Sequence, residues 1–155
     1  MTYHKTAITR NKPSYPAKWV ADNIGFAKNN LTLDFGAGRG FDASFYNLDA
    51  YDPSGYNYPV GDAPAHGIKY KTILCTYVLN TIEWEWNRKK VLDEIKGWLT
   101  EDGVAYVSVR NDKANLNGRT SRNTYQGHVQ LNYPVVHKNS NCVIYEIHKN
   151  SPHIA

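Results

Sequence analysis

The feature that most constrains the fold is the run of residues 31–40, in which a short apolar segment ends at Asp34 and passes into a glycine-rich loop. The loop has the pattern D-x-G-x-G-x-G, and its glycines are Gly36, Gly38 and Gly40. Glycine lets the backbone turn sharply and approach a ligand, because no Cβ stands in the way. A short helical stretch over residues 41–46 follows. This order of strand, loop and helix is typical of a nucleotide-type cofactor site at the end of a parallel strand.

The spacing of the glycines separates two kinds of cofactor. The dinucleotide fingerprint is G-x-G-x-x-G, with a helix N-terminus that faces a pyrophosphate. In this chain the third glycine comes one residue earlier, and the carboxylate of Asp34 would repel a pyrophosphate. An acid here suits a ligand with an amino group and a cationic centre, and S-adenosylmethionine (SAM) has both. The loop therefore predicts a SAM site, although a plain tight turn would also explain the glycines.

Other candidate cofactor residues lie close to the loop or at the end of the next strand. Asp52 follows Asp34 by eighteen residues and ends a predicted strand, where its carboxylate can accept hydrogen bonds from both ribose hydroxyls. A turn cap before Pro53 is the alternative for Asp52. Arg39 and Asp42 flank the loop. Arg39 is a candidate to pair with the carboxylate of SAM, or it is an ordinary surface arginine.

The remaining pattern predicts alternating strands and helices that end in a hairpin. We expect helices at 16–25, 41–46 and 88–99, strands at 31–35, 47–51, 71–80, 104–109, 129–136 and 142–148, a turn at 101–103 and a polar loop at 111–126. This order predicts an open, mostly parallel, Rossmann-like α/β sheet with a C-terminal antiparallel hairpin. It matches a minimal SAM-methyltransferase fold, because residues 53–70 are too short and too broken to hold another βα unit.

The length of 155 residues predicts a single domain over residues 1–155. Residues 1–30 would form an N-terminal arm and helix, residues 31–110 the cofactor-binding half, and residues 111–155 the substrate-side loop and closing hairpin. No apolar run approaches the roughly 20 residues of a membrane span, and the N-terminus does not read as a signal peptide. We therefore expect a cytoplasmic protein with no membrane partner.

The charge of the chain is unevenly distributed around a formal net value of +4. Residues 1–30 and 110–138 each carry five basic residues and one acidic residue, whereas residues 31–109 carry seven basic and eleven acidic residues. Basic flanks around a catalytic mouth would attract an anionic substrate. Loops that are merely solvated by Lys and Arg give the same distribution. We favour a nucleic acid or nucleotide as substrate, because both basic flanks should converge on one edge of the sheet.

Asn80 and Arg110 end two predicted strands, so both should lie near the cofactor and are our candidates for the catalytic side of the site. The amide of Asn80 would hold substrate or cofactor, or Asn80 is a strand-end turn residue. Tyr77 and Val78 would line the adenosine pocket or belong to the core. Methyl transfer is an in-line displacement in which the protein mainly aligns the reactants. No metal is required, and the histidines show no metal-ligand spacing.

The polar loop after Arg110 supplies candidates for substrate binding. Arg119 and Arg122 would contact phosphates, and Tyr125 would stack on a base. An ordinary surface loop is the alternative. Two familiar signatures of DNA-base methylation are missing: residues 80–83 keep the asparagine of [DNS]-P-P-[FYW] without its prolines, and no Pro-Cys pair follows that strand.

Four runs of the sequence occur together in a known family. They are K-T-A-I-x-R at residues 5–10, D-x-G-x-G-R-G-x-D at 34–42, Y-D-P at 51–53 and V-L-N-T-I-E at 78–83. The chain thereby resembles the methyltransferases associated with DNA phosphorothioation gene clusters, over roughly residues 5–110. The resemblance implies a class I SAM-dependent methyltransferase. It strengthens Arg39 and Asp42 as cofactor residues, and it adds Lys5 and Arg10 as substrate-side candidates.

Two other functions remain open. A domain of this fold would also serve as a non-catalytic partner subunit that binds SAM or no ligand, since the sequence shows no obvious catalytic base. An enzyme that consumes SAM as a lyase or hydrolase is the second alternative. The sequence does not set the oligomeric state, so a homo-oligomer stays open as well.

Overall fold

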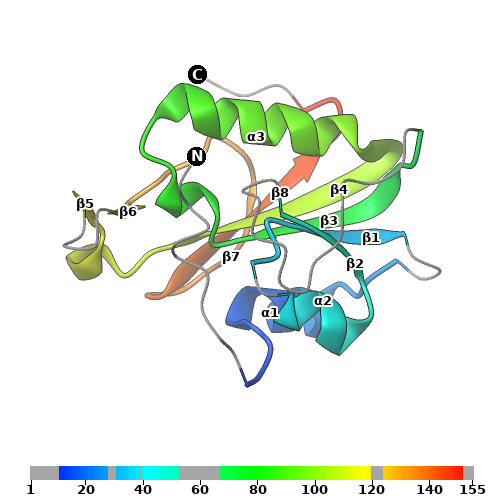
Figure 1. Cartoon of the computed structure of the whole chain (residues 1–155), viewed down its shortest axis with the longest axis horizontal. Coiled ribbons are helices and arrows are strands. Elements are labelled where there is room, and N and C mark those ends of the chain that lie inside the picture. The colour runs from blue at the N-terminus through cyan, green and yellow to red at the C-terminus, as the bar shows by residue number, and fades with distance from the viewer. Residues whose placement is uncertain (1–10, 28–30, 39, 53–66, 120–123, 152–155) are drawn as a thin grey trace.

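A computed structural model of the chain describes residues 11–27, 31–38, 40–52, 67–119 and 124–151. Six strands form the main sheet: β1 (Thr32–Phe35), β2 (Asp49–Tyr51), β3 (Tyr70–Thr76), β4 (Leu99–Arg110), β7 (Val135–Lys138) and β8 (Cys142–His148). Their order across the sheet is β2-β1-β3-β4-β8-β7 (Figure 1). The first four run parallel, whereas β8 is antiparallel to both β4 and β7. The predicted open, mostly parallel α/β sheet with a closing antiparallel hairpin is confirmed.

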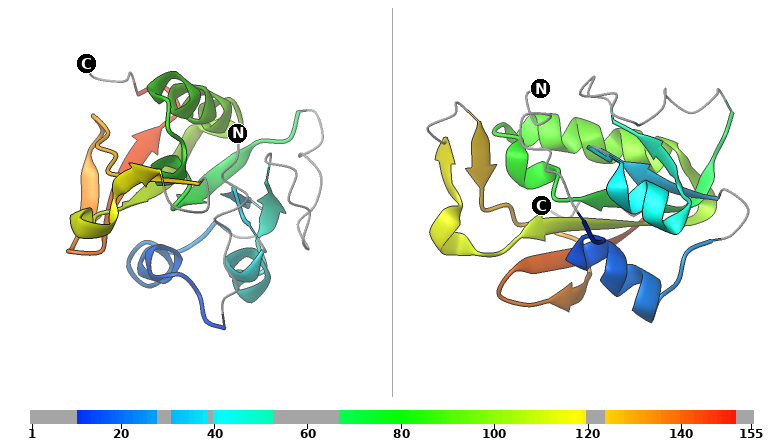
Figure 2. Two further views of the ribbon diagram at one scale, coloured as in Figure 1. Left: turned by 60° about the vertical axis from the view of Figure 1, so that its left-hand side comes forward. Right: turned by 60° about the horizontal axis from the view of Figure 1, so that its bottom comes forward.

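Helices cover both faces of this sheet. α3 (Glu85–Gly97) lies on one face, and α1 (Tyr15–Asn23) and α2 (Phe41–Tyr46) lie on the other (Figures 1 and 2). α1 begins where Ser14 is extended and its Oγ accepts a hydrogen bond from the Ala17 N–H, with Pro16 in the first turn. Among the described residues, no helix has the length and apolar character needed to cross a membrane.

The core consists of two clusters, one on each face of the sheet. Successive residues of β3 point to opposite faces: Ile73 and Cys75 belong to the larger cluster beneath α3, and Leu74 belongs to the cluster beside α1. The helices complete these clusters with Val91, Leu92 and Ile95 from α3 and Ala17 and Val20 from α1. β3 is therefore buried on both faces, as its continuous apolar run predicted.

The strand predicted over residues 71–80 ends earlier, and its predicted carboxyl end was wrong. β3 stops at Thr76, Tyr77 takes a φ of +58°, and residues Leu79–Thr81 form a 3-10 turn, η2. Non-glycine residues rarely take this left-handed conformation, so nothing in the residue types predicts the break. The chain consequently leaves the sheet three residues before Asn80.

α3 begins at Glu85, three residues before the predicted start of the helix at residue 88. Trp84 precedes it in an extended conformation and offers no side-chain cap. The usual Ser, Thr, Asp or Asn signal of a helix start is therefore missing, and the apolar periodicity that supported the prediction starts only at Val91.

β4 begins at Leu99, whereas the sequence predicted a strand over 104–109 preceded by a turn at 101–103. The register between β3 and β4 shifts next to Tyr70, so the extra residues are accommodated inside the strand as an irregularity. At this irregularity β4 comes close to the backbone of β3. Gly103 permits the approach, because a Cβ there would lie 2.9 Å from the carbonyl oxygen of Tyr70. The predicted turn was wrong for this reason.

The predicted polar loop over residues 111–126 has more structure than expected. It contains the 3-10 turn η3 (Lys113–Asn115) and a separate antiparallel ribbon of β5 (Asn117–Arg119) and β6 (Tyr125–Gly127). The ribbon lies at one end of the molecule, outside the main sheet (Figure 2). Strands of three residues are too short to show an alternating apolar pattern, so neither could be predicted.

The strand predicted over residues 129–136 is confirmed only at its carboxyl end, because β7 begins at Val135. Val129, Leu131 and Tyr133 are buried and alternate with exposed residues, which is the pattern of a strand. Their backbone joins no ladder in the described part of the chain; instead, the Leu131 N–H donates to the hydroxyl of Tyr145 at 3.1 Å. The alternation here reflects packing of an extended segment.

We expect Ile95→Ala to lower the free energy of unfolding by about 2–5 kcal/mol, because Ile95 is 0% exposed and its deletion leaves a cavity. Ile24→Ala is the matched control, since Ile24 is 44% exposed after the end of α1, and it should cost about 0.5 kcal/mol or less. Urea denaturation followed by circular dichroism measures both. Equal losses in the two variants would contradict the assignment of Ile95 to the core.

Candidate functional site

A cavity of about 390 Å³ opens where the carboxyl ends of β1, β3 and β4 meet. It is bordered by the glycine loop after β1, by Thr76 and Tyr77 at the end of β3, and by Arg110 at the end of β4. Open α/β sheets bind their ligands outside the carboxyl ends of the parallel strands. The cavity therefore lies where the sequence predicted the site.

The three glycines of the loop all have left-handed backbone angles, with φ of +73° at Gly36, +58° at Gly38 and +81° at Gly40. Hydrogen bonds tie the loop to the end of β2. The Gly36 N–H donates to the carbonyl oxygen of Tyr51 at 2.7 Å, and the Gly38 N–H donates to the carboxylate of Asp52 at 3.0 Å. The loop needs glycine for its conformation, and the carboxylate of Asp52 helps to hold it.

Val78, which follows the neighbouring strand β3, packs against the loop. A Cβ built on Gly36 would lie 2.5 Å from Cγ2 of Val78, a distance that real side chains do not reach. Val78 is 3% exposed and belongs to the core cluster beneath α3. Of the two predicted positions for Val78, pocket or core, the structure places it in the core, directly against the loop.

Carboxylates dominate the charged lining of the cavity. Asp34, Asp42 and Asp112 line it, and Arg110 is the cation of the described lining. Asp34 and Asp42 are buried, at 3% and 8% exposure. The formal charge of this lining is negative, which favours a ligand with a positive centre and disfavours a pyrophosphate.

Asp42 also connects α2 to α1. Its Oδ1 accepts a hydrogen bond from the Ser14 N–H at 2.8 Å, and its Oδ2 accepts one from the Ser14 hydroxyl at 2.6 Å. Ser14 is the residue that caps α1. The sequence predicted Asp42 as a cofactor residue, and the structure places it at the cavity with both oxygens held by the start of α1.

Arg110 and Asp112 form a two-point ion pair at the cavity. Nε of Arg110 donates to Oδ1 of Asp112 at 2.9 Å, and a terminal guanidinium nitrogen donates to Oδ2. These hydrogen bonds raise the pKa of Arg110 and lower the pKa of Asp112. The pair fixes the plane of the guanidinium, so Arg110 presents its charge to the cavity in one orientation.

Asn80 bridges three elements at the cavity wall. Its Nδ2 donates to Oε1 of Gln126 in β6 at 2.9 Å, and its Oδ1 accepts from the backbone N–H of Arg110 at 3.4 Å. Asn80 is 1% exposed. It lines the cavity as predicted, together with Gln126, which sequence reasoning missed because a glutamine in a polar loop carries no recognisable signal.

Tyr77 lines the cavity in a strained conformation. Its backbone N–H still donates to the carbonyl oxygen of Ser108 at 3.0 Å, although its φ is +58°. Its side chain hydrogen-bonds to the thiol of Cys142, whose pKa is raised by burial. Strained residues cluster at functional sites, where the surrounding structure holds them in place.

Some predicted site residues in the described part of the chain do not line the cavity. Asp52 is 2% exposed and, like Val78, does not line this cavity. Arg119 pairs with Glu83 at 2.6 Å, and the ring of Tyr125 packs over Gly127. Lys5, Arg10, Arg39 and Arg122 lie outside the described residues.

No model of a known protein family matches the sequence, and no curated protein matches it either. Among solved structures, the chain is similar to the CcbJ methyltransferase from Streptomyces caelestis, at 16% identity over 68% of this chain and 56% of that chain, with a TM-score of 0.47. It is similar to the glycopeptide N-methyltransferase MtfA complexed with S-adenosyl-L-homocysteine, at 13% identity over 92% of this chain and 78% of that chain, with a TM-score of 0.49.

A third similar structure is PKMT2 from Rickettsia typhi, at 17% identity over 63% of this chain and 25% of that chain, with a TM-score of 0.40. The chain therefore spans little more than half of CcbJ and a quarter of PKMT2. All three TM-scores are below 0.5.

Gly36→Ala should lower the free energy of unfolding by about 2–4 kcal/mol, because it adds left-handed strain to a collision with Val78. Gly97→Ala, at the end of α3, is the control: a Cβ there meets nothing within 4 Å, so the change should be neutral or stabilise by up to about 1 kcal/mol. Thermal and urea unfolding measure both. A Gly36→Ala protein as stable as Gly97→Ala would contradict the close packing of the loop.

Ser14→Ala should lower the free energy of unfolding by about 1–3 kcal/mol, because Asp42 loses one hydrogen-bond donor while it stays buried. Ser44→Ala is the control in the exposed part of α2 and should change stability by about 0.5 kcal/mol or less. A double-mutant cycle of Ser14→Ala with Asp42→Asn tests the contact itself. Strictly additive losses would show that the two side chains do not interact.

Proposed function

We propose that this protein is a SAM-dependent methyltransferase whose cofactor binds in the cavity at the carboxyl ends of β1 and β3. One observation carries the proposal: a glycine loop with left-handed backbone angles borders a cavity lined by carboxylates, at the edge of a parallel sheet where ligands bind. The sheet supplies the position, and the carboxylates select the charge of the ligand.

The described residues fit this cofactor. Three carboxylates and one guanidinium line the cavity, which suits the positive sulfur and the amino group of SAM. The cavity volume of about 390 Å³ lies within the range of cofactor pockets, roughly 300–1,000 Å³. The loop glycines leave backbone atoms accessible to a ligand, since they present no side chain there.

SAM supplies a methyl group that is already activated by its bond to a positively charged sulfur. The chain therefore needs to bind, orient and exclude water rather than to generate a strong nucleophile. We assign Asp34, which lines the cavity, to the amino end of the cofactor. Asp52 does not line the cavity and its carboxylate accepts from the Gly38 N–H, so we assign it to holding the loop on the ribose side of the cofactor. Asn80 and Tyr77 would position the acceptor at the wall of the cavity, where Asn80 is already oriented by Gln126.

We extend the proposal to the acceptor, for which we infer a nucleic acid or a nucleotide. Support comes from the basic segment that follows β4, in which Arg119 and Tyr125 belong to a ribbon next to η2. We also propose a cytoplasmic location. Arg119 is engaged by Glu83 in this structure, so an acceptor phosphate would have to compete with that carboxylate.

One observation favours a second candidate, a partner subunit that binds SAM without transferring its methyl group. Both amide atoms of Asn80 and the guanidinium of Arg110 are engaged within the protein.

Titration calorimetry with SAM, followed by transfer of a tritiated methyl group to RNA, DNA and nucleotides, separates the candidates. Binding without transfer favours the partner subunit, and breakdown of SAM in mass spectrometry with protein alone favours a lyase or hydrolase.

Asp34→Asn should weaken SAM binding by about 1–3 kcal/mol, because it keeps the size of a buried side chain at the cavity and removes its charge. Asp52→Ala should weaken binding by about the same amount, because the loop loses the carboxylate that accepts from the Gly38 N–H. Asp102→Asn is the control at the far, amino-terminal end of β4 and should leave affinity unchanged. Calorimetry on variants with native circular dichroism measures the effects, and wild-type affinity in Asp34→Asn would refute the cofactor site.

A further inference from the structure

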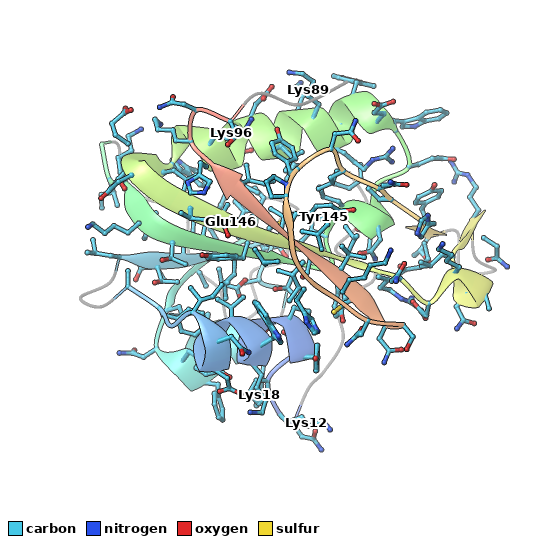
Figure 3. All side chains as sticks on the ribbon, turned by 180° about the vertical axis from the view of Figure 1, so that it is seen from behind. Lys12, Lys18, Lys89, Lys96, Tyr145 and Glu146 are labelled. Atoms are coloured by element: carbon cyan, nitrogen blue, oxygen red, sulfur yellow. The ribbon has the colours of Figure 1, made fainter. Side chains whose placement is uncertain are left out.

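A second and larger depression, of about 810 Å³, lies between α3 and the extended segment 128–133. We call it the tryptophan groove and define it by Trp84, Trp86, Arg88, Lys96, His128 and Tyr133. Figure 3 shows Lys89 and Lys96 along α3, with the segment before β7 passing beside the helix. The groove is separate from the cavity assigned to the cofactor, because the two share no lining residue.

Two large aromatic side chains are exposed at this groove. Trp84 and Trp86 are 62% and 63% exposed. Trp98, just beyond the other end of α3, packs against other aromatic rings, as a large aromatic side chain usually does. The centre of its ring lies 5.7 Å from that of Phe35 and 5.3 Å from that of Tyr51. Two exposed indoles that line one groove offer aromatic and apolar surface to a ligand.

Two cations of the groove, Arg88 and Lys96, form no ion pair with a carboxylate in the described part of the chain. Arg88 donates to the carbonyl oxygens of Ile82 and Glu83, at 2.6 and 3.0 Å. Lys96 donates to the Tyr133 hydroxyl at 2.8 Å and to the Ser151 carbonyl oxygen. Carbonyl and hydroxyl partners leave the positive charges in place, so the groove is complementary to an anion.

A third cation belongs to the same surface. Nζ of Lys90 lies 4.8 Å from the centre of the Trp86 ring. An acid in the groove, Asp93, is paired with Lys89 at 2.9 Å, which leaves Glu85 as the remaining carboxylate of the lining. Positive charge beside accessible aromatic faces is the combination that binds single-stranded nucleic acid, because bases stack while phosphates are neutralised.

Two segments lead directly from the cavity into the groove. Thr81 lines the cavity and Trp84 lines the groove, and likewise Gln126 lines the cavity and His128 lines the groove. One residue of extended chain spans at most about 3.6 Å, so the Cα atoms of Gln126 and His128 are within about 7 Å of each other. If a nucleic-acid strand lay in the groove, its neighbouring nucleotides would therefore lie near the cavity.

We propose that the tryptophan groove binds single-stranded nucleic acid, with bases stacked on Trp84 and Trp86 and phosphates near Arg88, Lys90 and Lys96. The inference rests on the proposed function and deepens it, since it names the strand that carries the acceptor and the surface that holds it. Stacking tolerates any base, so the groove supplies affinity and register, and the cavity selects the reacting atom.

The test is fluorescence anisotropy with a labelled, mixed-sequence 12-nucleotide RNA or DNA strand, in low salt and without SAM. We expect the wild-type protein to bind, with affinity falling as salt rises. Trp84→Ala combined with Trp86→Ala should weaken binding by about tenfold or more. Replacing both by Phe should restore most of the affinity, because Phe still stacks.

Phe45→Ala is the matched control. Phe45 is 59% exposed on α2, on the opposite face of the sheet, so its loss should leave oligonucleotide affinity unchanged. Wild-type protein that binds no strand would overturn the inference, as would a folded Trp84→Ala/Trp86→Ala protein with unchanged affinity. A double variant that alters the oligomeric state in light scattering but still binds the strand would identify a protein interface instead.

The outcomes separate this inference from the proposed function. Strand binding is measured without the cofactor, whereas methyl transfer requires it. If the protein binds the oligonucleotide through the two tryptophans but does not bind SAM, the groove proposal stands and the methyltransferase proposal is refuted. Methyl transfer that is insensitive to both tryptophans would preserve the enzyme and refute the groove.

Discussion

The contact between Gly36 and Val78 is the constraint on which the site depends. Gly36 follows β1 and Val78 follows β3, and these two strands are direct neighbours in the sheet. After each strand the backbone turns away from the sheet through one left-handed residue, which is Gly36 after β1 and Tyr77 after β3. The missing Cβ at position 36 lets the two turns close on each other below the cavity, so the cavity forms above a packed floor.

The cavity is built largely from side chains that also hold the protein together. Asp42 is held by Ser14, Asn80 connects Gln126 to Arg110, and Arg110 is fixed by Asp112. These polar groups at the wall therefore have defined orientations. Such preorganisation lowers the cost of aligning a ligand, because the reorientation has been completed during folding.

The parts of the fold that could be predicted are those whose residue types carry a backbone or burial signal. The glycine spacing predicted the loop and the short helix α2 after it, and the apolar runs predicted β1 and β8 almost to the residue. The break at Tyr77 could not be predicted, because tyrosine disfavours the conformation that it adopts. Gln126 was missed because its role depends on a ribbon held by Asn80, and contacts across 46 positions leave no local pattern.

The two outer strands of the main sheet, β2 and β7, have three and four residues, whereas β3, β4 and β8 have seven to twelve and lie inside. Outer strands expose unpaired backbone groups and are the usual templates for aggregation. Short ones offer few hydrogen bonds to a second chain. The long apolar strands are thereby shielded from intermolecular pairing, and a stable assembly of this protein would be built through side-chain surfaces rather than by extension of its sheet.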